Sequence, residues 1–206
     1  WLDRGFAFVE SKGAFDRVLV YGLLLVILIT GALLLLRLNA GFLVSVPTTG
    51  GTLKEGVIGS PRFVNPVLAI TRADQDVTAL VYAGLLRVSA SGELVPDIAA
   101  DVTVSDDGLT YNVTLREDVV FHDGTPLTAD DVLFTVNLVQ DPLLKSPLQG
   151  NFDGVVVEKL GEYELNFVLE EPYTPFIENL TLGILPKHEW SNLTTDQIPF
   201  SQHNTE

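Results

Sequence analysis

An uninterrupted apolar run from residue 18 to residue 36 constrains this chain more than any other feature. Its 19 residues carry no charge, and Arg17 and Arg37 bracket them. As a helix rising 1.5 Å per residue, the run would be roughly 28 Å long, which is close to the hydrocarbon thickness of a bilayer. A helix on the surface of a core would be amphipathic, and this run is not. We therefore predict a transmembrane helix over residues 18–36.

A cleaved signal peptide is the alternative to an uncleaved anchor. The run is long for a signal peptide, and Arg37-Leu38-Asn39 provides no small-residue cleavage site after it. Three basic residues precede the run, whereas two follow it as far as residue 54. Because cytoplasmic flanks carry the excess of Lys and Arg, we predict a cytoplasmic tail over 1–17, a single-pass anchor over 18–36, a linker over 37–50 and an extracytoplasmic remainder.

The part of the chain after the linker is strongly acidic. The whole chain has 12 basic and 27 acidic residues, of which four and three lie within residues 1–50, leaving 8 and 24. The resulting net charge of −16 repels polyanions, so we exclude nucleic acid as a partner. The chain has no Cys, which excludes disulfides and thiolate metal sites. It has no Met, and residues 201–206 form neither a capped helix end nor a charged tail, so we expect both of its ends to be truncated.

The residues after the linker indicate an α+β pattern of hairpins with isolated helices. Alternating apolar and polar residues predict a first strand over 52–59, three hairpins and a further strand over 119–121. Apolar residues at helical spacing predict two helices and a shorter one. The predicted hairpins lie within 85–96, 102–115 and 155–169, and the predicted helices cover 73–83 (ended by Gly84), 129–140 and 176–180.

The stretch from residue 121 to residue 132 combines a tight turn with a helix start. Asp123-Gly124 is a strong turn pair, because Gly accepts the positive φ that such turns need. Thr128 followed three residues later by Asp131 is the pattern of a capping box. Asp130 and Asp131 are adjacent carboxylates, but neighbours on a helix point apart, so capping and the helix dipole explain them better than acid–base catalysis.

Several short motifs, in this order, resemble the bacterial extracellular solute-binding proteins of family 5. Each is weak alone, and their order over most of residues 50–206 carries the resemblance. They are Gly50-Gly51-Thr52-Leu53, Val64-Asn65-Pro66, Val81-Tyr82-Ala83-Gly84-Leu85-Leu86, Pro96-Asp97-Ile98-Ala99, Ser105-Asp106-Asp107-Gly108-Leu109-Thr110-Tyr111, the stretch 121–132, Gln140-Asp141-Pro142 and Ile184-Leu185-Pro186-Lys187-His188.

The resemblance implies an α/β fold, locally α+β, of the periplasmic-binding-protein type II. This fold is a two-lobed clamshell, and residues 51–206 would form its N-terminal part. By resemblance, residues 51–83 and 172–206 belong to the first lobe, residues 84–171 form an extra β-rich subdomain, and the second lobe lies outside this chain.

The same resemblance implies a function in uptake. The chain would belong to the extracytoplasmic substrate-binding component of an ABC importer, which captures oligopeptides or dipeptides by lobe closure and delivers them to permease subunits. No catalysis and no cofactor are expected. A membrane-tethered ligand-sensing ectodomain of the same fold is an alternative, as is a binder of a non-peptide solute such as a nickel chelate.

Four residues are candidates for ligand contact. Gly59, Ser60 and Phe63 lie in the loop after the first predicted strand, which approaches the peptide backbone in the family; a plain connecting loop is the alternative. Tyr82 could form the wall of a side-chain pocket, or could be a core residue of its helix. The three histidines (His122, His188 and His203) show no spacing typical of metal ligands, so we predict no metal site.

Overall fold

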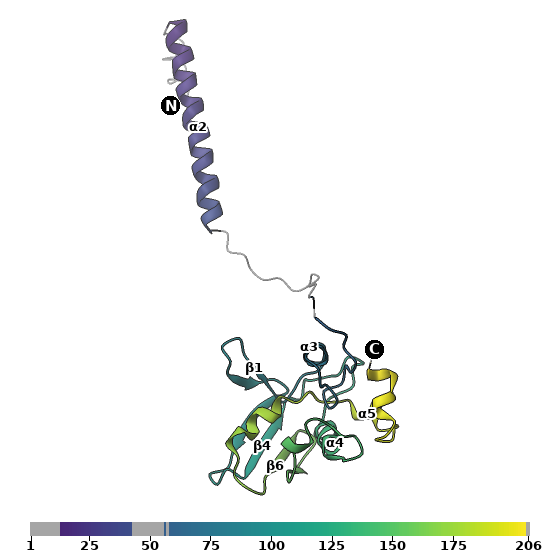
Figure 1. Cartoon of the computed structure of the whole chain (residues 1–206). Coiled ribbons are helices and arrows are strands. Elements are labelled where there is room, and N and C mark those ends of the chain that lie inside the picture. Colours follow the sequence, from purple (N-terminus) through teal and green to yellow (C-terminus); the bar gives the residue numbers. More distant parts are fainter. Residues whose placement is uncertain (1–12, 43–55, 57, 205–206) are drawn as a thin grey trace. The chain divides into compact units, whose positions relative to one another are not determined.

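The structure is a computed structural model that describes residues 13–42, 56 and 58–204 (Figure 1). Its chain divides into two compact units, Trp1–Lys54 and Glu55–Glu206, which we call the N-terminal unit and the C-terminal unit. Each is described by itself.

The N-terminal unit contains one long helix, α2 (Ala14–Phe42). Within it, Val18–Leu38 is long and apolar enough to cross a membrane, and none of this span is buried inside the chain. A helix satisfies its own backbone polar groups, which hydrocarbon requires. The Thr30 hydroxyl, a polar group inside the span, donates to the Val26 carbonyl at 2.8 Å. The apolar run therefore forms the helix that its composition predicts.

The C-terminal unit contains two antiparallel sheets, and the three predicted hairpins are confirmed. A small sheet pairs β1 with β2, and a larger one has the strand order β3-β4-β6-β5. The strands are β1 (Leu86–Val88), β2 (Leu94–Pro96), β3 (Ala99–Val104), β4 (Thr110–Leu115), β5 (Val156–Lys159) and β6 (Glu164–Val168).

One face of the larger sheet carries the core. Along β4, Tyr111, Val113 and Leu115 are buried while the residues between them are exposed, as their alternation predicts. Across the β4–β6 pair, Val113 lies opposite Leu165 and Tyr111 lies opposite Phe167. A one-residue slip of this register would turn the apolar side chains to solvent, so burial of one face fixes the pairing.

The α4 helix packs its apolar stripe into the same core. Val132, Val136 and Val139 are fully buried and belong to one cluster with Val113 and Leu165 of the sheet. This stripe follows the helical period and confirms the predicted helix over 129–140. The helices are α3 (Arg72–Val81), α4 (Ala129–Gln140), α5 (Lys187–Trp190) and the 3₁₀ turns η1 (Gln149–Asn151), η2 (Thr174–Thr181), η3 (Ile198–Phe200) and η4 (Gln202–Asn204).

The start of α4 confirms the predicted turn and capping box, but the two adjacent carboxylates have different partners. Gly124 has φ +87°, as the turn needs. The Asp131 carboxylate accepts from the Thr128 N–H at 2.9 Å, which closes the capping box. Asp130 instead pairs with Lys159 at 2.7 Å. Capping therefore explains Asp131, and a surface ion pair with Lys159 of β5 explains Asp130.

Two of the expected elements differ from the structure, and a third is for the most part not tested by it. The strand predicted over 52–59 lies largely outside the described residues, and Ile58 and Gly59 form a bend. The segment 119–121 makes only one bridge, from Val120 to Pro126. The pairing stays short because the tight turn at Asp123-Gly124 follows at once, with the Gly124 N–H donating to the Phe121 carbonyl at 2.9 Å.

The second difference concerns the end of α3. Gly84 does not end this helix, because Tyr82 is already its C-cap, in an extended conformation. Gly84 instead forms an antiparallel bridge to Gly183.

Two segments far apart in the sequence are tied together in the C-terminal unit. The Val64 N–H donates to the Asn204 carbonyl at 2.7 Å, and the Asn65 side-chain amide donates to the Asn204 Oδ1 at 3.0 Å. Both asparagines are buried. Their amides are satisfied within the protein, as burial of a polar group requires.

Candidate functional site

The loop that carries Gly59, Ser60 and Phe63 is anchored to α3 by one carboxylate. Asp74 Oδ1 accepts from the backbone N–H groups of Arg62 (2.6 Å) and Phe63 (3.1 Å), and its Oδ2 accepts from the Thr71 N–H at 2.9 Å. The Thr71 hydroxyl accepts from the Asp74 N–H in return, which completes a capping box. The loop is thereby held in one conformation, although it has no regular secondary structure.

The environment of Asp74 favours its charged form. Burial alone would raise the pKa of this carboxyl, but the backbone N–H groups of Arg62, Thr71 and Phe63 outweigh it and hold the pKa well below its usual 3.8. Hydrogen bonds to a carboxylate stabilise the ion over the acid. Since the folded pKa is depressed, this stabilisation is complete above the pKa of the unfolded chain and is lost as the pH falls toward the folded value.

Asp74→Asn is expected to lower the free energy of unfolding by about 2 kcal/mol at neutral pH, because one amide cannot accept from donors on both sides. The difference from the unchanged protein should shrink below about pH 4, where Asp74 of the unfolded chain is protonated. Urea unfolding between pH 3 and pH 7 measures this. The control is Asp76→Asn, which removes only an exposed pair with Arg72; a pH-independent difference for Asp74→Asn would contradict the prediction.

A groove of about 590 Å³ opens beside α3. Its walls come from α3, the β1–β2 hairpin, η1 and η2, which are far apart in the sequence. Apolar and neutral polar side chains make up nearly all of it, and Glu178 is its only charged residue. The lining residues are Pro66, Ala69, Gln75, Thr78, Ala79, Tyr82, Val88, Gly92, Leu94, Leu148, Asn151, Phe152, Glu178, Asn179, Thr181, Leu182 and Gly183.

Two polar features stand in the wall of this groove. The Asn151 side-chain amide donates to Asn179 Oδ1 at 3.2 Å, and the Asn179 amide donates to the Asn151 carbonyl at 3.1 Å. The Thr78 hydroxyl is buried and has no hydrogen-bond partner among the described residues. An unpaired buried hydroxyl costs free energy. Because this hydroxyl has almost no accessible surface, it is not open to the groove, although other atoms of Thr78 line it.

The wall beside Tyr82 depends on a very close approach of two backbone segments. A Cβ on Gly84 would lie 2.6 Å from the Thr181 carbonyl carbon, and a Cβ on Gly183 would lie 2.7 Å from the Tyr82 Cβ. The Ile184 N–H donates to the Ala83 carbonyl at 2.9 Å across this crossing. Only glycine fits at such a distance, so the two glycines hold η2 against the end of α3.

Tyr82 separates the groove from a second hollow of about 360 Å³, because it lines both. Burial of the ring and then the nearby Glu189 carboxylate raise the pKa of the Tyr82 hydroxyl above its usual 10. The second hollow is also lined by His122, Asp123 and His203. In it, hydrogen bonds from the Thr125 N–H and hydroxyl, followed by the pairing with His188, lower the pKa of Asp123 to about 2.

The four residues proposed from the sequence separate into two groups. Tyr82 lines the groove, whereas Gly59, Ser60 and Phe63 line neither hollow. Phe63 is half-buried against the core, with the Arg62 guanidinium 5.0 Å from its ring centre. Thr78, Asn151 and Asn179 were not predicted as groove residues, because they meet only when distant segments fold together. Contact of all four candidates with a ligand remains a prediction.

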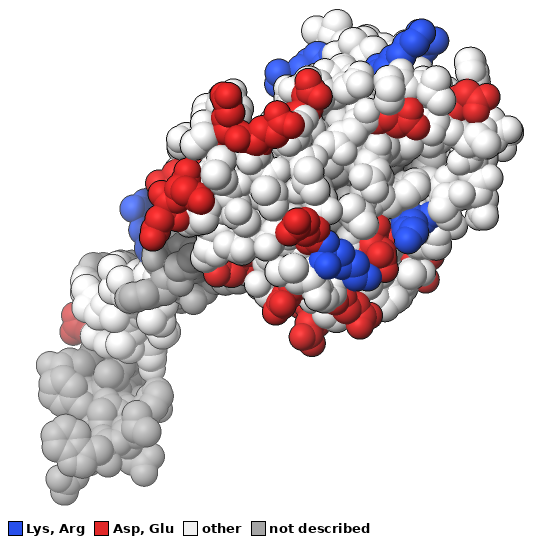
Figure 2. Space-filling view, turned by 90° about the horizontal axis from the view of Figure 1, so that it is seen from below, with Lys and Arg blue, Asp and Glu red and all other residues white. Residues whose placement is uncertain are grey.

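The surface charge agrees with the acidic composition. On the face shown in Figure 2, Asp and Glu side chains form several separate groups, with Lys and Arg interspersed among them. This face has no continuous basic patch of the kind that binds a polyanion. The groove itself is nearly uncharged, so its contacts are suited to peptide-like amides and apolar side chains rather than to phosphate.

The fold is that of a family of solute-binding proteins. The profile described as "Bacterial extracellular solute-binding proteins, family 5 Middle" matches residues 93–201, which is more than half of the chain. The chain belongs to this family, as the order of its short motifs predicts.

Individual relatives agree with this assignment. The oligopeptide-binding protein AppA of Bacillus subtilis is 31% identical over 161 residues, which cover 77% of this chain and 30% of AppA. The solved structure of AppA with a nonapeptide matches with a TM-score of 0.69 at 29% identity, over 73% of this chain and 30% of that one.

Two further solved structures match over similar lengths. NikZ of Campylobacter jejuni, in complex with Ni(L-His), matches with a TM-score of 0.65 at 33% identity, over 71% of this chain and 29% of that one. The ABC transporter substrate-binding protein CtaP of Listeria monocytogenes matches with a TM-score of 0.65 at 37% identity, over 72% and 30%. The chain thus spans about 30% of the length of these proteins and represents one part of a two-lobed fold.

Proposed function

We propose that this chain is part of the extracytoplasmic substrate-binding component of an ABC importer that captures oligopeptides or dipeptides. The ligand would occupy the groove beside α3, and a second lobe would close over it before delivery to permease subunits. Closure would be a population shift that the bound peptide stabilises. The proposal assigns no chemical reaction to this part of the protein.

The groove is the observation that carries this proposal. It offers an apolar floor for side chains and the paired amides of Asn151 and Asn179. Such a mixture suits a peptide, whose backbone needs hydrogen-bond partners and whose side chains vary. The likeness to AppA with its bound nonapeptide supports the same ligand class. The Ni(L-His) in NikZ makes a nickel chelate the leading alternative.

We further propose that α2 anchors the protein in the cell membrane through residues 18–36, with residues 1–17 on the cytoplasmic side. The length and composition of the span support this. The division of residues 51–206 into first-lobe segments (51–83 and 172–206) and a subdomain (84–171) belongs to the same proposal. A ligand-sensing role would keep the anchor and the fold but would lack permease partners.

Native mass spectrometry of the full-length gene product tests both proposals together. Peptide masses released on denaturation are expected, along with a polypeptide mass that includes the apolar span. A discrete non-peptide mass would overturn the peptide assignment and keep solute binding. A polypeptide that begins after residue 36 would overturn the anchor.

A bulky side chain in the groove should weaken binding of the peptide identified in this way. Val88 is 61% exposed in β1 and lines the groove, whereas Val156 is 57% exposed in β5 and does not. We expect Val88→Trp to lower peptide affinity at least about tenfold in calorimetry, because its ring occupies ligand space. Val156→Trp, the matched control, should bind as the unchanged protein does. Equal affinities for the two variants would show that the ligand lies elsewhere.

A further inference from the structure

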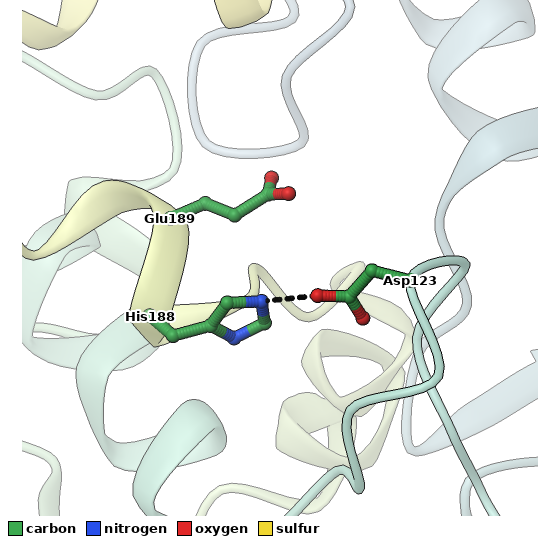
Figure 3. A group of neighbouring side chains, drawn as sticks. All are labelled: Asp123, His188 and Glu189. Atoms are coloured by element: carbon green, nitrogen blue, oxygen red, sulfur yellow. Dashed lines mark hydrogen bonds and ion pairs between the residues drawn. The ribbon is translucent and has the colours of Figure 1, made fainter.

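Three side chains that can each bind a metal ion meet at the edge of the second hollow. Asp123 belongs to the turn before α4, and His188 and Glu189 belong to α5, 65 residues further along the chain (Figure 3). One ligand atom from each lies within 4.8 Å of the other two. The His188 Nε2 is 2.7 Å from Asp123 Oδ2, and the Glu189 carboxylate extends toward the same space.

Contacts on both sides orient these ligands. The Thr125 N–H donates to Asp123 Oδ1 at 2.9 Å, and the Thr125 hydroxyl donates to Oδ2 at 2.8 Å. The His188 ring meets the edge of the Phe121 ring, with 5.8 Å between their centres. The first residue of α5 is held because the Lys187 N–H donates to Asp131 Oδ1 at 2.9 Å. Such support around the ligands is what orients a metal site.

The Glu189 carboxylate makes no ion pair within the part of the chain that the structure describes. It therefore brings a second negative charge to the pair of Asp123 and His188 without a cation of its own. Both Asp123 and Glu189 line the second hollow, which gives solvent access to the cluster. An acidic surface of this kind also raises the local concentration of cations.

The ligand set selects a class of ion. One imidazole with two carboxylates suits a divalent transition metal, and zinc is bound by such groups at about 2.0–2.2 Å. A zinc ion between His188 and Asp123 needs their ligand atoms about 3.0–3.4 Å apart, which is a small rotation away from the present 2.7 Å. Both side chains are partly exposed and can make that rotation. Three protein ligands leave a fourth position open to water or to a small ligand.

We propose that Asp123, His188 and Glu189 form a solvent-accessible binding site for a divalent transition metal ion, with zinc the best match to the ligand set. None of the three lines the groove, and Tyr82 stands between the two hollows. The site is therefore separate from the proposed peptide site, and its occupancy does not depend on the peptide assignment.

Calorimetry of zinc binding to the full-length gene product tests the site. A chelator first removes any metal already bound. We expect one equivalent to bind with micromolar affinity, and cobalt to give the visible absorption of a low-symmetry nitrogen–oxygen site. Glu189→Gln and His188→Ala should each weaken zinc binding at least about tenfold. His122→Ala is the matched control, because His122 lines the same hollow outside the cluster.

The same variants define the results that would contradict the proposal. Glu189 has no ion-pair partner to lose, so Glu189→Gln should keep the melting temperature of the metal-free protein and report on the ligand alone. Absence of zinc binding by the unchanged protein would overturn the site. Equal zinc affinity of Glu189→Gln, His188→Ala and His122→Ala would also overturn the site, because the bound zinc would then lie elsewhere.

Discussion

Replacing Gly84 with Ala is expected to lower the free energy of unfolding of the C-terminal unit by about 3 kcal/mol or more. The new Cβ would lie 2.6 Å from both the carbonyl carbon and the carbonyl oxygen of Thr181, and 2.9 Å from its Cα. All three are backbone atoms, so no side-chain rotation relieves the clash. The crossing must open, and the Ile184-to-Ala83 hydrogen bond and the wall of the groove beside Tyr82 open with it.

Gly150→Ala is the matched control for this prediction. Gly150 has an ordinary negative φ, and a Cβ there meets nothing within 4 Å. Urea unfolding should therefore place Gly150→Ala within about 0.5 kcal/mol of the unchanged protein. Gly84→Ala should in addition lose peptide affinity, since the groove wall moves. Equal stability of the two variants would mean that the close approach is not required.

Asp131→Asn is expected to destabilise the protein by about 2–4 kcal/mol, although it changes only one oxygen to an amide nitrogen. Asp131 is buried, and it accepts from Thr128 through Oδ2 and from the Lys187 N–H through Oδ1. An amide can accept on one side only. Its N–H₂ group would therefore face a donor, and a buried donor would lose its partner.

The neighbouring carboxylate supplies the control for this second prediction. Asp130 is partly exposed and pairs with Lys159 on the surface. Asp130→Asn should cost at most about 1 kcal/mol, because exposed ion pairs contribute little. Urea unfolding compares the two variants, and amide hydrogen exchange at Lys187 should accelerate only in Asp131→Asn. A larger loss of unfolding free energy in Asp130→Asn than in Asp131→Asn would refute the assignment of Asp131 as the structural carboxylate.

The elements predicted well are those whose signals are local in the sequence. The bounds of α4 follow from a capping box at Thr128, an apolar stripe and a proline after Asp141. The same signal stands at Thr71 and Asp74, where we predicted the helix but not its capping box. Hairpin positions follow from alternation and turn residues for the same reason.

The features that were not predicted from the sequence depend on residues far away in the chain or on the partner strand. The segment 119–121 has strand-like composition, but its partner lies just across a tight turn and the pairing is a single bridge from Val120 to Pro126. The groove unites Thr78 with Asn151 and Asn179, and the candidate metal cluster unites Asp123 with His188 across 65 positions. Spacing along the chain carries no trace of either, because tertiary packing creates both.

The tie between Val64, Asn65 and Asn204 has a consequence for the order in which the protein folds. Asn65 and Asn204 are 139 positions apart. Closing so long a loop costs about 4 kcal/mol of chain entropy. The hairpins and helices between the two residues make local contacts that do not depend on this closure, so they can form before it. Because a chain is made from its N-terminus, the segment around Val64 must wait for residue 204 to be synthesised. The first segment of this unit to be made is therefore among the last to reach its final contacts.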